Sequence, residues 1–274
     1  MLAALLALFV ETEFPLCRFE QVAPQPIGEQ FVPSRNQSRA IVLMHGLVLH
    51  PFSEKRAKMP LMRKWQLPDS HTVRTLAKIG DVFSFAYSQT MHVDTIAERC
   101  GLLGYICELK RLGYKEIVLI GHSAGGVIAR QFVEDHPDSG VTKLIQICAR
   151  NGGSSWAKIA VVREAQREFV RSLTKESRAR SLAMRREKRL PAHVEVVCLV
   201  GNGTGEGDGL VNCQCQWTSG LRAQGIPGLP LPFTHWRAMR NEKSIDQIKK
   251  HILTKYSRWQ QEQIRMSIGS LFDR

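Results

Sequence analysis

The sequence predicts one large α/β domain with a mostly parallel central sheet and helices on both of its faces. Short apolar runs typical of buried strands alternate with stretches of helical periodicity, which is the pattern of parallel strands joined by crossover helices. The chain has 274 residues, enough for one such domain with its own core. Hydrophobic residues make up 43% of it and charged residues 23%, as in globular proteins.

Five apolar runs predict the strands of this sheet. Each is short and ends near turn residues or at a change to helical periodicity, which favours a strand over a core helix. The runs cover residues 40–44, 81–87, 116–120, 143–148 and 193–200.

Three of the segments around these runs predict long helices. One is expected at residues 94–112, with Asp94 as its cap and Gly113 at its end. Its apolar face should consist of Ile96, Cys100, Leu103 and Cys107. A second helix is expected at 124–135, before Pro137, and a third follows residue 235, where Ile245, Ile248 and Ile252 share a face.

The first 38 residues are expected to form a leader or N-terminal extension, and residues 39–274 the domain itself. Pro24, Pro26 and Pro33 interrupt regular structure in the leader. Residues 2–10 are apolar like the centre of an export signal, but no Lys or Arg precedes them. The run is also consistent with an anchor or with an element packed on the domain. We expect a cytoplasmic or membrane-associated protein, with export as the alternative.

The charge and the cysteines restrict the choice of partners. A net charge of +13 favours acidic partners such as nucleic acid, anionic lipid or acidic substrates. No module that binds nucleic acid is recognisable, so we expect no nucleic-acid partner. The seven cysteines cannot all pair within one chain, and free thiols favour a reducing compartment. Cys213 and Cys215 lack the spacing of common zinc sites, so we expect no metal.

A Gly-x-Ser-x-Gly pentapeptide lies between a predicted strand and a predicted helix. Its residues are Gly121, His122, Ser123, Ala124 and Gly125. A serine at such a sharp turn projects its hydroxyl above the sheet, and only small neighbours let the backbone approach so closely. The N-terminus of the following helix adds a partial positive charge nearby. Ser123 is therefore the candidate nucleophile, although a helix-capping serine in a glycine-rich loop would give the same pattern.

A serine hydroxyl is a weak nucleophile and needs a base. His235 is the candidate base, because it lies late in the chain just before a predicted helix. Asp208, in a Gly-Asp-Gly-Leu-Val segment, is the candidate carboxylate that would orient the imidazole and stabilise its cation. Glu206 is the alternative acid. The other histidines considered are His45, His50, His122, which we expect to be structural, and His251, which we expect at the surface.

The order Ser123, Asp208, His235 is the order used by α/β-hydrolases. With the strand-ending pair His45-Gly46, it makes residues 40–252 resemble the lipase- and esterase-like branch of the α/β-hydrolase superfamily. The resemblance implies an α/β-hydrolase fold with a helical lid insertion. It also implies an oxyanion hole formed by the backbone N–H groups of Leu47 and Ala124.

The resemblance implies a serine hydrolase that cleaves carboxylic esters through an acyl-enzyme, with no cofactor. The expected substrate is a small ester or a lipid. An acyltransferase or thioesterase with the same triad is one alternative, and a non-catalytic scaffold of hydrolase fold is another. Acyl length, head group and oligomeric state have no signature in the sequence.

Residues 151–190 form a basic insertion at the position of a lid in this family. Eleven Lys or Arg and four Glu lie between residues 151 and 189. We expect one helix face to form an apolar acyl-binding wall at the mouth of the site, and the opposite face to be basic. The first face consists of Ile159, Val162, Phe169 and Leu173, and the second of Arg163, Arg167, Arg171 and Lys175. The basic face is either solvated or in peripheral contact with an anionic membrane.

Overall fold

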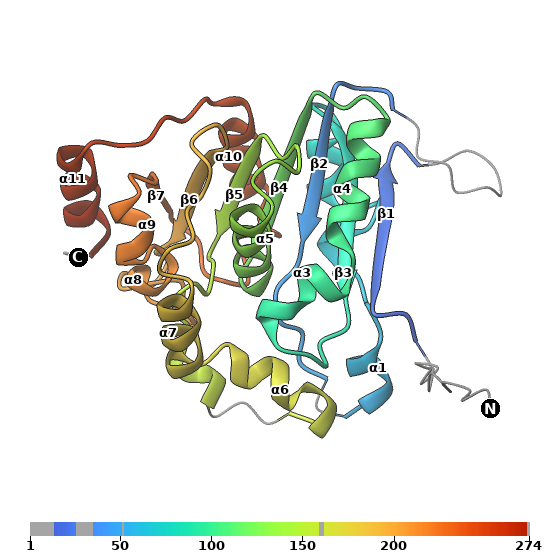
Figure 1. Cartoon of the computed structure of the whole chain (residues 1–274), viewed down its shortest axis with the longest axis horizontal. Coiled ribbons are helices and arrows are strands. Elements are labelled where there is room, and N and C mark those ends of the chain that lie inside the picture. The colour runs from blue at the N-terminus through green and yellow to red at the C-terminus, as the bar shows by residue number, and fades with distance from the viewer. Residues whose placement is uncertain (1–13, 26–34, 51, 159–161, 273–274) are drawn as a thin grey trace, which may run out of the picture.

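The computed structural model describes residues 14–25, 35–50, 52–158 and 162–272. Seven strands form one sheet in the order β1-β3-β2-β4-β5-β6-β7, and only β1 runs antiparallel to its neighbour (Figure 1). The strands are β1 (Cys17–Ala23), β2 (Arg39–Met44), β3 (Asp81–Tyr87), β4 (Glu116–His122), β5 (Lys143–Ile147), β6 (Glu195–Gly201) and β7 (Gly228–Leu231).

Helices cover both faces of the sheet (Figure 1). On one face lie α3 (Ile96–Arg99), α4 (Leu102–Arg111), α5 (Ala124–Asp135) and α11 (Gln261–Phe272), and on the other α2 (His71–Leu76) and α10 (Glu242–Leu253). The remaining helices are α1 (Glu54–Lys58), α6 (Glu164–Ser172), α7 (Lys175–Met184), α8 (Cys213–Gln216) and α9 (Ser219–Ala223). Short 3₁₀ turns are η1 (Lys64–Gln66), η2 (Val93–Thr95) and η3 (Ser155–Lys158).

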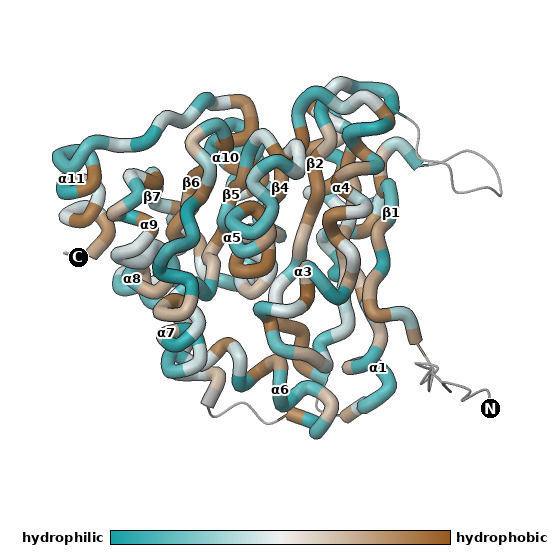
Figure 2. The backbone as a smooth tube through the Cα atoms, in the orientation of Figure 1, coloured by the Kyte–Doolittle hydropathy of each residue, from teal (hydrophilic) through white to brown (hydrophobic). Residues whose placement is uncertain are grey.

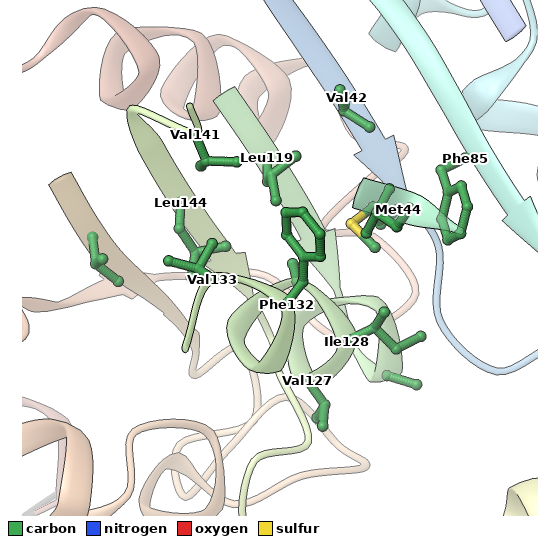
Figure 3. Packing of buried hydrophobic residues seen from close by; sticks show 14 of the residues in the cluster. Val42, Met44, Phe85, Leu119, Val127, Ile128, Phe132, Val133, Val141 and Leu144 are labelled. Atoms are coloured by element: carbon green, nitrogen blue, oxygen red, sulfur yellow. The ribbon is translucent and has the colours of Figure 1, made fainter. Parts of the chain in front are cut away.

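The sheet separates two apolar clusters, because successive side chains of a strand point to opposite faces. In β2, Val42 and Met44 belong to the cluster under α5, whereas Ile41 and Leu43 belong to the cluster under α10. Figure 2 shows hydrophobic residues gathered in the central strands and hydrophilic residues in the outer helices and loops. In Figure 3, Phe132 of α5 packs toward the strands that carry Leu119 and Leu144. The predicted α/β architecture with two covered faces is confirmed.

The bounds of four of the five predicted strands differ from the observed ones by only one or two residues, and β3 has the predicted bounds. The helix expected at 124–135 is α5, with unchanged bounds. Both results follow from strong local patterns. A strand buried on two faces is continuously apolar, and α5 begins at a glycine-rich turn and ends before Pro137.

The expected leader contains part of the sheet. Cys17–Ala23 forms β1, which pairs with β3 from Cys17 opposite Tyr87 to Ala23 opposite Val82. Phe19 stacks between Phe83 and Tyr105, with ring centroids 5.5 and 4.7 Å apart. The sheet therefore begins before residue 39, and the expected boundary is wrong for this segment. The apolar run at 2–10 lies outside the described residues.

The helix expected at 94–112 is broken into η2, α3 and α4. Gly101 has φ +61°, a left-handed conformation that interrupts the helix. Because of this break, the residues of α4 that face the core differ from those that one continuous helix would bury. Leu103 and Cys107 are consequently exposed, although the predicted face includes them. The buried positions of α4 are Leu102, Ile106 and Leu109.

The basic insertion folds into η3, α6 and α7, and Figure 1 shows α6 and α7 near the carboxyl ends of the strands. Phe169 and Leu173 are buried in the core cluster, and the ring of Phe169 lies 6.1 Å from that of Tyr87. Val162 packs partly buried against the same cluster, and Ile159 lies outside the described residues. The four predicted basic positions, Arg163, Arg167, Arg171 and Lys175, are exposed as expected.

Within the described residues, no helix is both long enough and apolar enough to cross a bilayer.

Asp94 anchors the insertion to the body of the domain. Its Oδ1 accepts hydrogen bonds from Gln131 Nε2 in α5, at 2.6 Å, and from the guanidinium of Arg178 in α7, which is 2% exposed. Burial by itself would raise the pKa of Asp94. The charge of Arg178 and hydrogen bonds from Ser181, Gln131 and Arg178 outweigh burial, so the pKa lies below its usual value.

Replacing Asp94 by asparagine should lower the free energy of unfolding by about 3 kcal/mol, because Arg178 would stay buried without its counter-charge. Since the native pKa of Asp94 is lowered, its stabilising effect is present above the unfolded pKa of about 3.9 and is lost as the pH falls through the native pKa. Urea unfolding at pH 7 measures the change. Glu108→Gln, which removes the exposed partner of Arg111, is the control and should have no measurable effect. Equal effects of the two substitutions would contradict the anchoring role.

Candidate active site

Ser123 lies at the turn between β4 and α5. Its backbone has φ 57° and ψ −120°, a conformation that is strained for an L residue. Hydrogen bonds hold the turn in place: the Ser123 N–H donates to Ile147 O at 2.9 Å, and its carbonyl accepts from the N–H groups of Gly126 and Arg150. The neighbouring strand β5 and the segment after it thus fix the serine above the sheet.

Three glycines leave room for this turn. A Cβ atom on Gly125 would lie 2.4 Å from Met44 O, and one on Gly121 would lie 2.5 Å from Gly125 O. A Cβ atom on Gly46 would lie 2.5 Å from Ser123 Cβ and 2.9 Å from its Oγ. Side chains at these positions would force the backbone or the serine to move, so the glycines set the position of the hydroxyl.

Asp208 and His235 form a buried hydrogen-bonded pair. Nδ1 of His235 donates to Oδ2 of Asp208 at 2.7 Å, and the residues are 3% and 1% exposed. Oδ1 of Asp208 accepts from the N–H groups of Leu210 and Val211, at 2.9 and 2.8 Å. The predicted base and acid thus lie in contact, whereas Glu206 is exposed.

Because the carboxylate accepts from Nδ1, the Nε2 atom of His235 carries the free lone pair of the neutral ring. Burial lowers the pKa of His235, the hydrogen bond and the charge of Asp208 raise it, and the charge of Arg150 lowers it. The net shift is downward. His235 is therefore neutral near pH 7, the state in which an imidazole accepts a proton.

His122 supports this pair. Its ring centroid lies 4.7 Å from that of His235, and its Nε2 lies 3.2 Å from the His235 carbonyl oxygen, to which it donates. Burial and the charge of His235 hold the pKa of His122 well below its usual value. A neutral His122 thus packs against the ring of His235 and binds its backbone.

One group of side chains in the described part of the chain has ligand atoms close enough for a metal. The ligand atoms of His122, Cys148 and His235 lie within 4.8 Å of one another. His235 already uses Nδ1 to bind Asp208, and burial raises the pKa of the Cys148 thiol well above its usual value. A metal ion binds the thiolate form of cysteine, which this raised pKa disfavours. The three side chains are therefore better suited to the Asp208–His235 hydrogen bond than to holding a metal ion.

Arg150 contacts the Ser123 hydroxyl and was not predicted. After β5 ends, Cys148 turns with φ 50°, and Nε of Arg150 then donates to Ser123 Oγ at 3.2 Å. Among the described residues, no hydrogen bond joins Ser123 Oγ to His235. The sequence offered only one signal for Arg150: a charged residue just after the carboxyl end of a buried strand, where parallel sheets place their sites.

The two predicted oxyanion donors belong to segments that adjoin Ser123. Ala124 is the first residue of α5, so its N–H has no acceptor within the helix. Leu47 follows β2 at the loop that begins with Gly46, and it lines the same pocket as His235. In the described structure, neither N–H group donates a hydrogen bond, so both are available to a ligand.

His45 shapes the loop that carries Leu47. It is 1% exposed and stacks on Tyr87 with ring centroids 4.5 Å apart. Its Nδ1 donates to Gly46 O at 2.7 Å, and burial lowers its pKa to about 4. His45 is therefore a neutral, structural residue that fixes the start of the loop.

A pocket of about 240 Å³ opens at His235. Its lining includes three arginines and the apolar residues Leu47, Val48, Leu49, Trp65, Trp156, Trp236 and Met239. Phe169 and Leu173 do not line it, so the predicted acyl-binding wall is wrong for these two: their helix face turns into the core. A larger cavity of about 930 Å³ lies between α6, α7 and the segment of Phe14 and Leu16, and its lining does not include His235. Ser123 is buried and lines neither of the two, but Arg150, which contacts its hydroxyl, lines the smaller pocket.

Comparison with known proteins agrees with this architecture. A sequence model described as the alpha/beta hydrolase fold matches residues 76–194. No curated protein sequence matches the chain.

Solved structures with a similar fold include lipases and esterases. The mature lipase BlEst2 of Bacillus licheniformis superimposes with a TM-score of 0.63 and 14% identity, over 86% of this chain and 98% of that one. The metagenomic carboxyl esterase MGS0156 gives 0.53 and 16%, over 84% and 81%. Aspergillus fumigatus lipase B gives 0.55 and 14%, over 93% and 60%. The chain therefore has the α/β-hydrolase fold, which it shares with these lipases and this esterase.

Proposed function

We propose that this chain is a serine hydrolase that cleaves carboxylic esters. The observation that carries the proposal is the buried 2.7 Å hydrogen bond between Asp208 and His235, which leaves a neutral imidazole with a free Nε2. The strained turn at Ser123 also supports the proposal. His122 precedes Ser123 in this turn, and the ring of His122 contacts the ring of His235.

In the proposed mechanism, Ser123 Oγ attacks the ester carbonyl carbon while Nε2 of His235 accepts the hydroxyl proton. Asp208 keeps Nδ1 protonated and stabilises the imidazolium. The N–H groups of Leu47 and Ala124 stabilise the oxyanion of the tetrahedral intermediate. His235 then gives its proton to the leaving alcohol, and water cleaves the acyl-enzyme by the same route.

The contact with Arg150 is compatible with this mechanism. A serine hydroxyl accepts hydrogen bonds through two lone pairs and still has its own O–H to donate. Accepting from Arg150 therefore leaves the proton free for His235. In unliganded sites the hydrogen bond between nucleophile and base often forms or tightens only when substrate binds, and the proposal places that step in the substrate complex.

Ser123→Ala should lower kcat on a simple ester such as p-nitrophenyl acetate by at least about a thousandfold, because the nucleophile is lost. The protein should stay folded, since alanine fits the space of the serine, with at most a small loss of stability from the hydrogen bond that Arg150 no longer makes. Initial rates and circular dichroism measure the two effects. Ser219→Ala, an exposed position on α9, is the matched control and should keep the wild-type rate. A Ser123→Ala protein that keeps most of its activity would contradict the proposed nucleophile.

The pH dependence should follow the protonation of His235. Its pKa lies below the usual value of about 6.5, so kcat/KM should fall only when the pH drops below that value. Arg150→Gln removes a positive charge that disfavours the imidazolium, so the acid limb should move to higher pH. Arg150→Lys keeps the charge and should leave the limb in place. A shift to lower pH in Arg150→Gln would contradict the assignment.

A further inference from the structure

The pocket at His235 is lined by three arginines, Arg63, Arg150 and Arg240, and its lining contains no Asp or Glu. Within the described residues, none of the three forms an ion pair with a carboxylate. By contrast, the buried Arg130 and Arg178 of this chain each bind an acidic partner, Glu134 and Asp94. The arginines of the pocket thus differ from Arg130 and Arg178 in having no carboxylate in contact, although the more distant charge of Asp208 acts on Arg150.

Arg150 is the most buried of the three. It is 2% exposed, and its Nη1 atom has no hydrogen-bond partner among the described residues. Its guanidinium lies 5.8 Å from the ring centroid of Trp156, and its one hydrogen bond goes from Nε to Ser123 Oγ. A buried cation with an unsatisfied donor is costly: burial outweighs the opposing charge of Asp208 and lowers the pKa of Arg150 to about 10. An anion in the pocket would satisfy both the charge and the donor.

Arg63 and Arg240 add positive charge to the same pocket. Arg63 is half-buried beside Trp65, and Arg240 is exposed in the segment before α10. Burial lowers the pKa of Arg63, and the charge of Arg240 lowers it further, so the two cations repel each other. A negatively charged group bound in this pocket would relieve that repulsion.

Building on the proposed function, we infer that the preferred substrate is a small carboxylic ester that also carries an oxyanion, a carboxylate or a phosphate, held by Arg150, Arg63 and Arg240. Arginine suits both groups because its planar fork donates two parallel hydrogen bonds. The apolar part of the substrate lies against the tryptophans and leucines of the same pocket.

The geometry limits the size of this substrate. Nε of Arg150 hydrogen-bonds Ser123 Oγ directly. An anion bound to the other nitrogens of the same guanidinium would form hydrogen bonds of about 2.8 Å, so one guanidinium group separates it from the serine hydroxyl. The anionic group is therefore a few bonds from the ester carbonyl. The pocket volume of about 240 Å³ lies below the range of about 300 to 1,000 Å³ that holds drug-sized ligands.

Binding to the Ser123→Ala protein tests the inference separately from catalysis. The carboxylate arm compares monomethyl succinate with its uncharged amide, methyl succinamate. The phosphate arm compares acetylated glycerol phosphate with acetylated glycerol. Calorimetry should show tighter binding of the charged member by about 10- to 100-fold in at least one arm, which identifies the preferred anion.

Arg240→Gln, made in the Ser123→Ala protein, should reduce this preference about tenfold. Arg237→Gln is the matched control, because it removes the same charge three residues earlier, outside the pocket lining. Equal affinity for charged and uncharged members in both arms, or equal effects of the two substitutions, would overturn the inference. If the charged ester binds as expected but the wild-type protein hydrolyses neither member, the anion pocket stands and the proposed hydrolase function falls.

Discussion

The backbone of Ser123 turns through φ 57° and ψ −120° between β4 and α5, and the rest of the site depends on that turn. Strain of this kind persists only where the surroundings hold it, and here β5 supplies the acceptor for the serine N–H. The close approach of β2 requires glycine at 46 and 125, where a Cβ atom would collide with the turn or with the strand end. The same turn starts α5, so one constraint places the hydroxyl and leaves the Ala124 N–H free beside it.

Around this turn the site buries Asp208, His235 and Arg150, and the protein provides many more partners for the charge of Asp208 than for that of Arg150. Asp208 receives two backbone N–H groups and the imidazole of His235, so its charge is well solvated by the protein. Arg150 contacts no carboxylate among the described residues and feels Asp208 only through its charge, and its own charge lowers the pKa of His235. The imbalance keeps His235 neutral, as the proposed base must be, and it leaves the pocket with an excess of positive charge. Proton transfer and selection of an anionic ester would then have a common electrostatic origin.

Local patterns in the sequence predict the buried strands, the bounds of α5 and the contact of Asp208 with His235. What they miss depends on tertiary contacts. Strand β1 is a short edge strand between prolines, and it exists because β3, some sixty residues later, pairs with it. The spacing of Phe169 and Leu173 predicts that they share a face, but not that this face turns to the core. Arg150 is one of 38 basic residues, and only the fold brings it to Ser123.

The most direct test of the account is to identify the residue that reacts covalently with a fluorophosphonate, an electrophile that labels activated serines. The wild-type protein is incubated with the reagent at pH 7, digested, and its peptides are analysed by mass spectrometry. We expect one phosphonylated residue, Ser123, and slower labelling when Asp208 is replaced by asparagine, because His235 then loses the carboxylate that orients it. Labelling at another serine, or none at Ser123 in folded protein, would contradict the account.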